Sequence, residues 1–141
     1  MLAAVIDTNI FISGLLKGSS PSAILDALRD NKFRLLISPE LLDEVAITAR
    51  KPRLARIISP GDLAELLDLL NQKAFIIEPK TRLKISRDPK DDMLIECALE
   101  GNGSLIVTRD RDLLDLKEYG SFKMILPEEF TRMLSNKRLS W

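Results

Sequence analysis

The sequence predicts an α/β fold in which a mostly parallel sheet of about five strands is covered by helices on both faces. Short apolar runs alternate with longer stretches whose apolar residues recur at helical spacing, an order typical of parallel βαβ units. The runs are apolar at nearly every position, as expected of strands with no wet face. A chain of 141 residues has the usual size of one domain, so we expect one core.

Five apolar runs are expected to form the strands. The first run ends at Asp7-Thr8-Asn9, where the chain turns polar. Similar runs recur along the chain, separated by the stretches with helical periodicity. The five runs are residues 2–6, 34–38, 74–77, 104–108 and 123–126.

Prolines mark the expected starts of five helices. Proline suits the first helical turn because that turn leaves its N–H groups unpaired, and the preceding side chain can usually accept one of them. The expected order is strand, two helices, strand, two helices, strand, helix, strand, short helix, strand, helix. The five dipeptides are Ser20-Pro21, Ser38-Pro39, Ser59-Pro60, Asp88-Pro89 and Leu126-Pro127.

No linker or internal repeat interrupts this order. Residues 1–134 are therefore expected to form one domain. Residues 135–141 form a C-terminal tail that is expected to fray, unless Trp141 docks on a neighbouring surface.

The composition excludes several kinds of chemistry. The absence of histidine removes Ser/His and Cys/His nucleophilic systems and the usual zinc sites, so catalysis must use carboxylates, lysines, hydroxyls or a hard metal ion. The single cysteine, Cys97, cannot form an internal disulfide and is expected to be a small core residue. The 21 basic and 21 acidic residues cancel, so attraction to nucleic acid would depend on local charge.

The sequence carries no sign of a membrane or an export pathway. No apolar run approaches the roughly 20 residues that cross a bilayer, and the N-terminus lacks the pattern of a signal peptide. We therefore expect a cytoplasmic protein that does not contact membranes.

Acidic residues follow two of the expected strands. Asp7 closes the first run and Asp110 follows the fourth. Ligands of open parallel sheets bind at the C-terminal ends of the strands, which makes these two aspartates candidate site residues. Each could instead cap the helix that follows it.

Glu44 is a third candidate because it lies on the apolar stripe of its predicted helix. Leu41, Val45 and Thr48 occupy the same face at spacings of three and four residues. Alternatively, Glu44 lies at the edge of that stripe and reaches solvent or pairs with Arg50.

The densest acidic cluster opens the helix after Pro89. Asp88 is expected to cap this helix, and Asp91 to serve its first turn. Asp92 lies on a stripe with Ile95 and Leu99, so its carboxylate is expected to point towards the site. One turn further, Glu96 could line the same face or pair with a basic neighbour.

Four acids from separate segments, in a chain without histidine, favour a hard divalent cation as their partner. Magnesium or manganese would remove the repulsion between the carboxylates. Either ion also lowers the pKa of a bound water and stabilises charge on a phosphoryl oxygen. The sequence therefore points to phosphodiester chemistry.

Four stretches of the chain, in this order, resemble the PIN-domain family, the fold of VapC-like toxin ribonucleases. They are VIDTN at 5–9, SPELLDEV at 38–45, DDMLIECA at 91–98 and IVTRDRDL at 106–113. The resemblance implies a three-layer α/β/α sandwich and a magnesium- or manganese-dependent endoribonuclease. It also implies a homodimer and, for a toxin, a small antitoxin encoded beside it. The implied metal-binding acids are Asp7, Glu44, Asp92 and Asp110.

Two of these assignments have close alternatives, since Asp91 adjoins Asp92 and Asp112 lies two residues from Asp110. A shift of register would exchange their roles. Three polar residues match positions that orient the acids or a water in similar proteins, although each could simply cap a helix. They are Thr8, Asn9 and Thr108.

Two basic segments, residues 50–56 and 80–87, each carry four basic residues and no acid. Both border the predicted site, so we expect them to hold the RNA backbone, although solvated loops would have the same composition. The residues expected to bind RNA are Arg50, Lys51, Arg53, Arg56, Arg82 and Lys84.

The leading hypothesis is cleavage of single-stranded RNA to products with a 5′-phosphate and a 3′-hydroxyl. In this hypothesis Glu44 binds the cation or positions the attacking water. One alternative is a magnesium-dependent phosphomonoesterase, but such enzymes commonly have a second aspartate where this chain has Asn9. The other alternative is a domain that binds RNA or protein without catalysis.

Overall fold

The computed structural model of the protein describes residues 1–15 and 19–135, so Trp141 and nearly all of the expected tail lie outside the described residues. Six strands form one sheet, in the order β3-β2-β1-β4-β6-β5. All neighbouring strands are parallel except β5 and β6. The strands are β1 (Ala3–Ile6), β2 (Arg34–Ile37), β3 (Phe75–Ile76), β4 (Leu105–Val107), β5 (Glu118–Tyr119) and β6 (Phe122–Ile125).

The five predicted strands are present, and the sixth, β5, was not predicted. It pairs antiparallel with β6 through a tight turn in which Gly120 has a φ of 58°. Glycine adopts this left-handed conformation without steric cost. Its two residues, Glu118 and Tyr119, belong to no apolar run, which is why the sequence did not indicate it.

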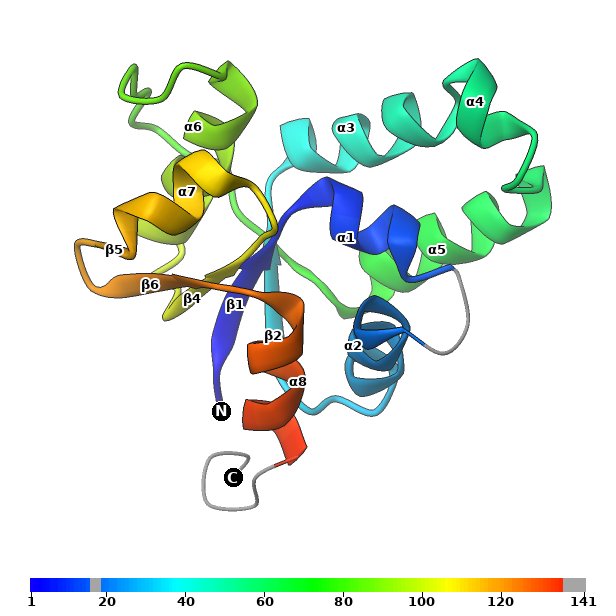
Figure 1. The fold of residues 1–141 in the computed structure, drawn as a ribbon, viewed down its shortest axis with the longest axis horizontal. Coiled ribbons are helices and arrows are strands. Elements are labelled where there is room, and N and C mark those ends of the chain that lie inside the picture. The colour runs from blue at the N-terminus through cyan, green and yellow to red at the C-terminus, as the bar shows by residue number, and fades with distance from the viewer. Residues whose placement is uncertain (16–18, 136–141) are drawn as a thin grey trace.

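Helices cover both faces of the sheet, and the three-layer α/β/α arrangement is confirmed (Figure 1). On one side lie α1 (Thr8–Ser13), α2 (Ser20–Arg29), α3 (Pro39–Ala49), α5 (Pro60–Lys73) and α8 (Pro127–Ser135). On the other side lie α6 (Pro89–Glu100) and α7 (Arg111–Leu116). The same grouping follows from the contacts, since α6 packs on β1, β4 and β2.

The predicted helix starts are confirmed. Helices α3, α5, α6 and α8 begin at Pro39, Pro60, Pro89 and Pro127. The side chains of Ser38, Ser59 and Asp88 accept backbone N–H groups of their own helices, whereas α2 is capped by Ser19 and not by Ser20. An unpredicted turn of helix, α4 (Pro52–Ala55), lies inside the first basic segment, where Pro52 starts it.

The core follows the apolar runs. Ala4, Val5 and Ile6 of β1 are buried, as is every residue of β4, because these strands lie in the middle of the sheet. The edge strand β3 is exposed, and the Arg34 guanidinium covers the Phe75 ring at 4.5 Å from its centre. Within the described residues, no helix has the length and apolar character needed to cross a bilayer.

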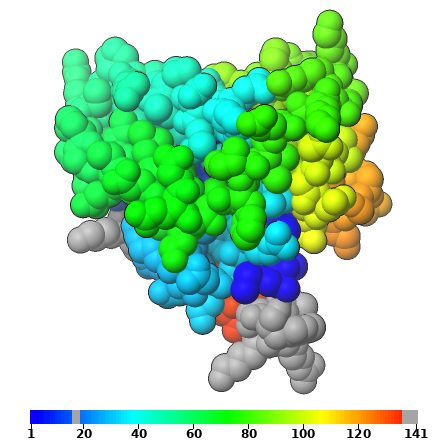
Figure 2. Space-filling model, turned by 180° about the vertical axis from the view of Figure 1, so that it is seen from behind, coloured from blue at the N-terminus to red at the C-terminus, as the bar shows by residue number. Residues whose placement is uncertain are grey.

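The segment between β3 and α6 has no helix or strand from residue 77 to residue 88. Figure 2 shows green residues of α5 and of the chain that follows β3 over much of the face seen from behind. Hydrogen bonds to acidic side chains hold this segment, as described below.

Helix α6 depends on Ile95 for its position on the sheet, because this side chain is fully buried. We expect Ile95→Ala to lower the free energy of unfolding by about 2–5 kcal/mol, because apolar burial decreases and a cavity is left behind. Urea unfolding followed by circular dichroism measures this. The control Leu116→Ala changes a half-exposed residue of α7 and should lower stability by less than about 1 kcal/mol. If both variants lower the free energy of unfolding equally, the packing of Ile95 against the sheet is contradicted.

Candidate active site

The candidate site lies where β1 and β4 end side by side. Asp7 follows β1 and caps α1, while Asp110 follows β4 and caps α7. Asp7 Oδ1 accepts the N–H of Asn9 at 3.2 Å, and Asp110 Oδ1 accepts the N–H of Asp112 at 2.8 Å. Both aspartates therefore cap helices and also project a second oxygen at the C-terminal edge of the sheet.

Thr108 joins these two aspartates. Its hydroxyl donates to Asp7 Oδ2 at 2.8 Å and accepts the backbone N–H of Asp110 at 3.0 Å. The threonine is fully buried, so its hydroxyl fixes the Asp7 carboxylate in one orientation. Of the other two supporting residues, Asn9 contributes its backbone N–H, and Thr8 is buried in the wall of the adjoining pocket.

An acidic pocket of about 140 Å³ opens between α1, α3, α6 and α7. Its wall also contains two lysines, Lys51 and Lys90. Because the carboxylates come from different elements, only the folded chain brings them together. The acids that line the pocket are Asp7, Glu44, Asp88, Asp91 and Asp110.

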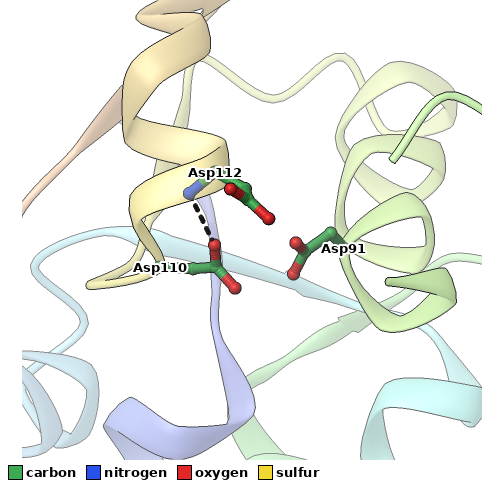
Figure 3. Close-up of side chains that lie close together, drawn as sticks. All are labelled: Asp91, Asp110 and Asp112. Atoms are coloured by element: carbon green, nitrogen blue, oxygen red, sulfur yellow. Dashed lines mark hydrogen bonds between the residues drawn. The ribbon is translucent and has the colours of Figure 1, made fainter. Parts of the chain in front are cut away.

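Asp91 points from the first turn of α6 towards the start of α7 (Figure 3). Oxygens of Asp91, Asp110 and Asp112 lie within 4.8 Å of one another. Asp91 is 3% exposed, and its Oδ2 has no hydrogen-bond partner among the described residues. A buried carboxylate oxygen without a donor is unfavourable unless a further ligand completes it.

The pKa values reflect this crowding. Burial raises the pKa of Asp91 to about 7, and the negative charges of Asp110, Asp88 and Asp7 act in the same direction. Burial also raises the pKa of Asp7, although the hydrogen bonds from Thr108 and Asn9 oppose the rise. The carboxyl groups of Asp91 and Asp7 therefore hold a proton more tightly than isolated aspartates do.

The structure corrects the assignment of Asp92, which does not reach the pocket. Its Oδ1 accepts the backbone N–H groups of Ile85 and Ser86 at 3.3 and 2.9 Å. Consecutive helical residues point about 100° apart, so the choice between Asp91 and Asp92 depends on which face of α6 meets the sheet. The face predicted for Asp92 included Leu99, which is exposed, whereas the inward face includes Asp91 and the fully buried Ala98.

Asp92 belongs to an acidic stripe on α6, with Glu96 and Glu100 at successive intervals of four residues. Glu96 Oε2 accepts the N–H of Leu83 at 2.7 Å, and Glu100 Oε1 accepts the N–H of Lys80 at 2.9 Å. The stripe thus satisfies backbone donors of the irregular segment 77–88. Glu96, a second-rank site candidate, has a structural role here.

Glu44 lines the pocket from α3, and the buried stripe predicted for that helix is present. Its Oε2 lies 3.1 Å from Lys90 Nζ, so its ion-pair partner is Lys90 and not Arg50. Asp112 lies at the outer side of the cluster, where Arg87 Nη2 contacts its Oδ1 at 2.6 Å. Asp110, the preferred member of that pair, lines the pocket itself.

The two basic segments differ. Arg50, Lys51, Arg53 and Arg56 are exposed and form no ion pair within the described part of the chain. In the second segment, Arg82 contacts both Glu40 and Glu96, so its charge ties α3 to α6.

Lys84 is exposed beside a separate cavity that Asp92 and Glu96 line. The first basic segment is therefore the better placed to meet a polyanion, because Lys51 reaches the wall of the acidic pocket.

Sequence reasoning missed two residues of this pocket. Asp88 was interpreted only as a cap, but it caps α6 and also lines the pocket. Lys90 gave no signal at all, because a lysine next to two aspartates resembles a solvated helix end. Cys97 is a core residue as predicted, and burial raises the pKa of its thiol to about 12.

The residues present fit a hard divalent cation. The pocket offers carboxylate oxygens, the ligands that magnesium and manganese prefer, and one of them is buried without a donor among the residues that the structure describes. A cation there would offset the repulsion that raises the pKa of Asp91.

Comparison with known proteins gives the family. A family model described as PIN domain matches residues 3–112. The chain belongs to the PIN domain family. This PIN domain is 30% identical over 139 residues to a protein named "Uncharacterized protein MJ1680" of Methanocaldococcus jannaschii, and the match covers 92% of this chain and 89% of that protein. PIN domains are generally nucleases, and a cluster of three acidic residues is present in this one.

A solved structure shares the fold of this PIN domain. It is the crystal structure of VapBC2 from Rickettsia felis bound to a DNA fragment from their promoter. The match has a TM-score of 0.57 at 17% identity and covers 89% of this chain and 98% of that chain. At this level of identity the likeness shows the fold.

The raised pKa values give the metal-free PIN domain a defined pH dependence. A carboxyl group whose pKa is higher when folded stabilises the fold below its unfolded pKa near 3.8, and that stability is lost as the pH rises towards about 7. We therefore expect Asp91 and Asp7 to lower the melting temperature between pH 4 and pH 7 in the presence of a chelator. Adding manganese at pH 7 should raise it again.

The adjacent acids of α6 supply the matched pair for this test. Asp91→Asn should flatten the pH dependence, because it removes the buried charge. Asp92→Asn should keep the pH dependence and lower stability by about 1–2 kcal/mol, because it weakens the hydrogen bonds from Ile85 and Ser86. The assignment of Asp91 to the pocket is wrong if both variants keep the wild-type pH profile.

Proposed function

We propose that this PIN domain is a metal-dependent endoribonuclease that cleaves single-stranded RNA and acts as the toxin of a toxin–antitoxin pair. The observation that carries the proposal is the buried Oδ2 of Asp91, without a partner among the described residues, in a pocket shared with Asp7 and Asp110. Membership of the PIN domain family supports nuclease chemistry at that pocket.

The proposed cofactor is magnesium or manganese, held by Asp7, Asp91 and Asp110. When bound, such an ion supplies positive charge for the phosphoryl oxygens and lowers the pKa of a nearby water. Thr108 holds the Asp7 carboxylate in place through its hydroxyl. Asp91 and Asp110 project from the starts of α6 and α7, whose caps fix their directions.

Glu44 is the proposed acceptor for the proton of the attacking water. It lines the same pocket as Asp110 but comes from a separate helix, α3. Transfer of that proton to the Glu44 carboxylate lets the water oxygen attack the phosphorus. The bond to the 3′-oxygen then breaks, and this oxygen keeps the bonding electrons and takes up a proton from solvent water. The proposed products therefore carry a 5′-phosphate and a 3′-hydroxyl.

The proposed RNA contacts are Arg50, Lys51, Arg53 and Arg56, whose charges are free of carboxylate partners within the described chain. A phosphodiester has to enter a pocket of about 140 Å³. A single strand can bend its backbone into such a pocket, whereas an A-form duplex presents a stiff, shape-defined surface. Single-stranded RNA is therefore the proposed substrate.

The toxin role and its partners rest on the resemblance to VapC-like toxins and on the shared fold with VapBC2. We propose a homodimer, a small antitoxin encoded beside this chain, and action in the cytoplasm, with residues 1–134 as the nuclease domain. Growth arrest on expression of the chain, relieved by the neighbouring small protein, tests this role. Unimpaired growth would contradict it.

Replacing the proposed metal ligands should abolish RNA cleavage. We expect Asp7→Asn, Asp91→Asn and Asp110→Asn each to lower the rate on single-stranded RNA at least about 100-fold, because each removes a carboxylate from the cation. Chelator should stop the wild-type reaction, and manganese should restore it. Gel analysis of labelled single-stranded RNA, duplex RNA and single-stranded DNA measures both rate and preference.

Asp92→Asn is the matched control and should retain cleavage within a few-fold, since Asp92 faces segment 77–88. Equal cleavage by wild type and Asp7→Asn would indicate contamination or another mechanism. Hydrolysis of small phosphate esters without RNA cleavage would favour a phosphomonoesterase, and metal-independent RNA binding without cleavage a non-catalytic domain.

The first basic segment should govern RNA affinity. We expect Arg53→Ala with Arg56→Ala, in the inactive Asp110→Asn background, to weaken binding and to reduce the salt slope by about 0.7 for each phosphate that the protein no longer neutralises. Fluorescence anisotropy with labelled single-stranded RNA over a salt series measures this. Arg29→Ala, an exposed arginine on α2, is the control and should leave the slope unchanged. An unchanged slope in the double variant would exclude Arg53 and Arg56 as phosphate ligands.

A further inference from the structure

The turn that opens α6 carries two cations, and each pairs with an acid on a different helix. Lys90 Nζ lies 3.1 Å from Glu44 Oε2 of α3, and Arg87 Nη2 lies 2.6 Å from Asp112 Oδ1 of α7. Residues 87–90 therefore bridge the two sides of the acidic pocket. The acids that receive these cations are Glu44, which lines the pocket, and Asp112, which lies beside Asp91 and Asp110.

Three further acids of the pocket lack such a cation in the part of the chain that the structure describes. Asp7, Asp91 and Asp110 form no ion pair with any described residue. Their partners in the chain are hydrogen-bond donors, and Asp91 Oδ2 lacks even these within the described residues. The protein thus pairs Glu44 and Asp112 with its own cations, and within the described residues it pairs Asp7, Asp91 and Asp110 with none.

The Lys90–Glu44 pair is the one that bears on the cation. Its glutamate side chain is 13% exposed and its lysine side chain 53%, whereas both partners of the surface pair Arg29–Asp26 are more than half exposed. Burial of the glutamate removes part of the water that screens the pair, so the lysine holds Glu44 more firmly than it would hold a fully exposed carboxylate. Lys90 also lines the pocket directly beside Asp91 in the sequence.

We propose that Lys90 is a positioning residue that keeps Glu44 out of the ligand set of the divalent cation. The inference rests on the proposed function. The cation then binds through Asp7, Asp91 and Asp110, and Glu44 remains available as the acceptor for the proton of the attacking water. Removal of the Lys90 charge would free Glu44 to bind the cation together with the other carboxylates. Glu44 would then no longer be available to accept the proton of the attacking water.

Manganese binding in the absence of RNA tests this inference. We expect Lys90→Gln to bind manganese about tenfold more tightly than wild type in isothermal titration calorimetry, because a carboxylate is released to the ion and a like charge is removed. The gain should shrink to about threefold or less when the same substitution is made in the Glu44→Gln background, where only the like charge is removed. Lys90→Arg, which can keep the ion pair, should bind as wild type does.

Two controls and one rate measurement accompany this titration. Arg29→Gln removes a surface ion pair on α2 and should leave manganese affinity unchanged. Thermal melts by circular dichroism show that each variant is folded. The rate of RNA cleavage by Lys90→Gln should fall even though the metal binds more tightly, because Glu44 has left its role.

The results that would contradict the inference differ from those that would contradict the proposed function. If wild type binds manganese but Lys90→Gln binds no more tightly, the inference is overturned and the proposed function stands. The inference is also overturned, and the proposed function stands, if the gain in manganese affinity is equally large with and without Glu44. The lysine would then act only by direct electrostatic repulsion of the cation. If wild type binds no manganese at all, the proposed function and the inference are overturned together.

Discussion

Repulsion between carboxylates gathered in one small pocket is the constraint on which the rest of this structure depends. Burial and the charges of its neighbours raise the pKa of Asp91. The folded chain therefore holds these carboxylates close together although they repel one another. The fold meets that demand with fixed elements: helix caps orient Asp7 and Asp110, and a buried threonine hydroxyl bridges them. The packed strands β1 and β4 carry both aspartates and supply the rigidity.

Helix α6 uses acidic residues for two opposite purposes. On one face, Asp91 is buried and its Oδ2 lacks a donor among the described residues. On another face, Asp92, Glu96 and Glu100 receive backbone N–H groups from the segment between β3 and α6. That segment has little secondary structure to pair its amides, so the acidic stripe does so instead. The chain itself supplies donors to Asp92, Glu96 and Glu100, whereas the described residues supply none to Asp91 Oδ2.

Helix capping and site chemistry are not alternatives in this molecule. Asp7, Asp88 and Asp110 each accept an amide of the helix they begin, and each also lines the acidic pocket. One carboxylate oxygen serves the helix, and the other remains for the pocket. The same carboxylate can cap a helix and line the pocket because several helices begin at the C-terminal edge of the parallel strands. These helix starts lie close together where the strand order reverses.

The sequence by itself determined five of the six strands that the structure describes, the helix starts marked by proline and the segments that carry the acids, because these follow from local periodicity and capping. It also predicted Asp7, Glu44, Asp110 and Thr108 at one edge of the sheet, where the structure places them. Only the tertiary structure decided between Asp91 and Asp92, because the packing of α6 on β1 and β4 fixes which face of the helix is turned towards the pocket. Only the tertiary structure likewise pairs Lys90 with Glu44, and Arg82 with Glu40 and Glu96. Long, flexible charged side chains find their partners across elements distant in sequence, and no local pattern encodes those pairings.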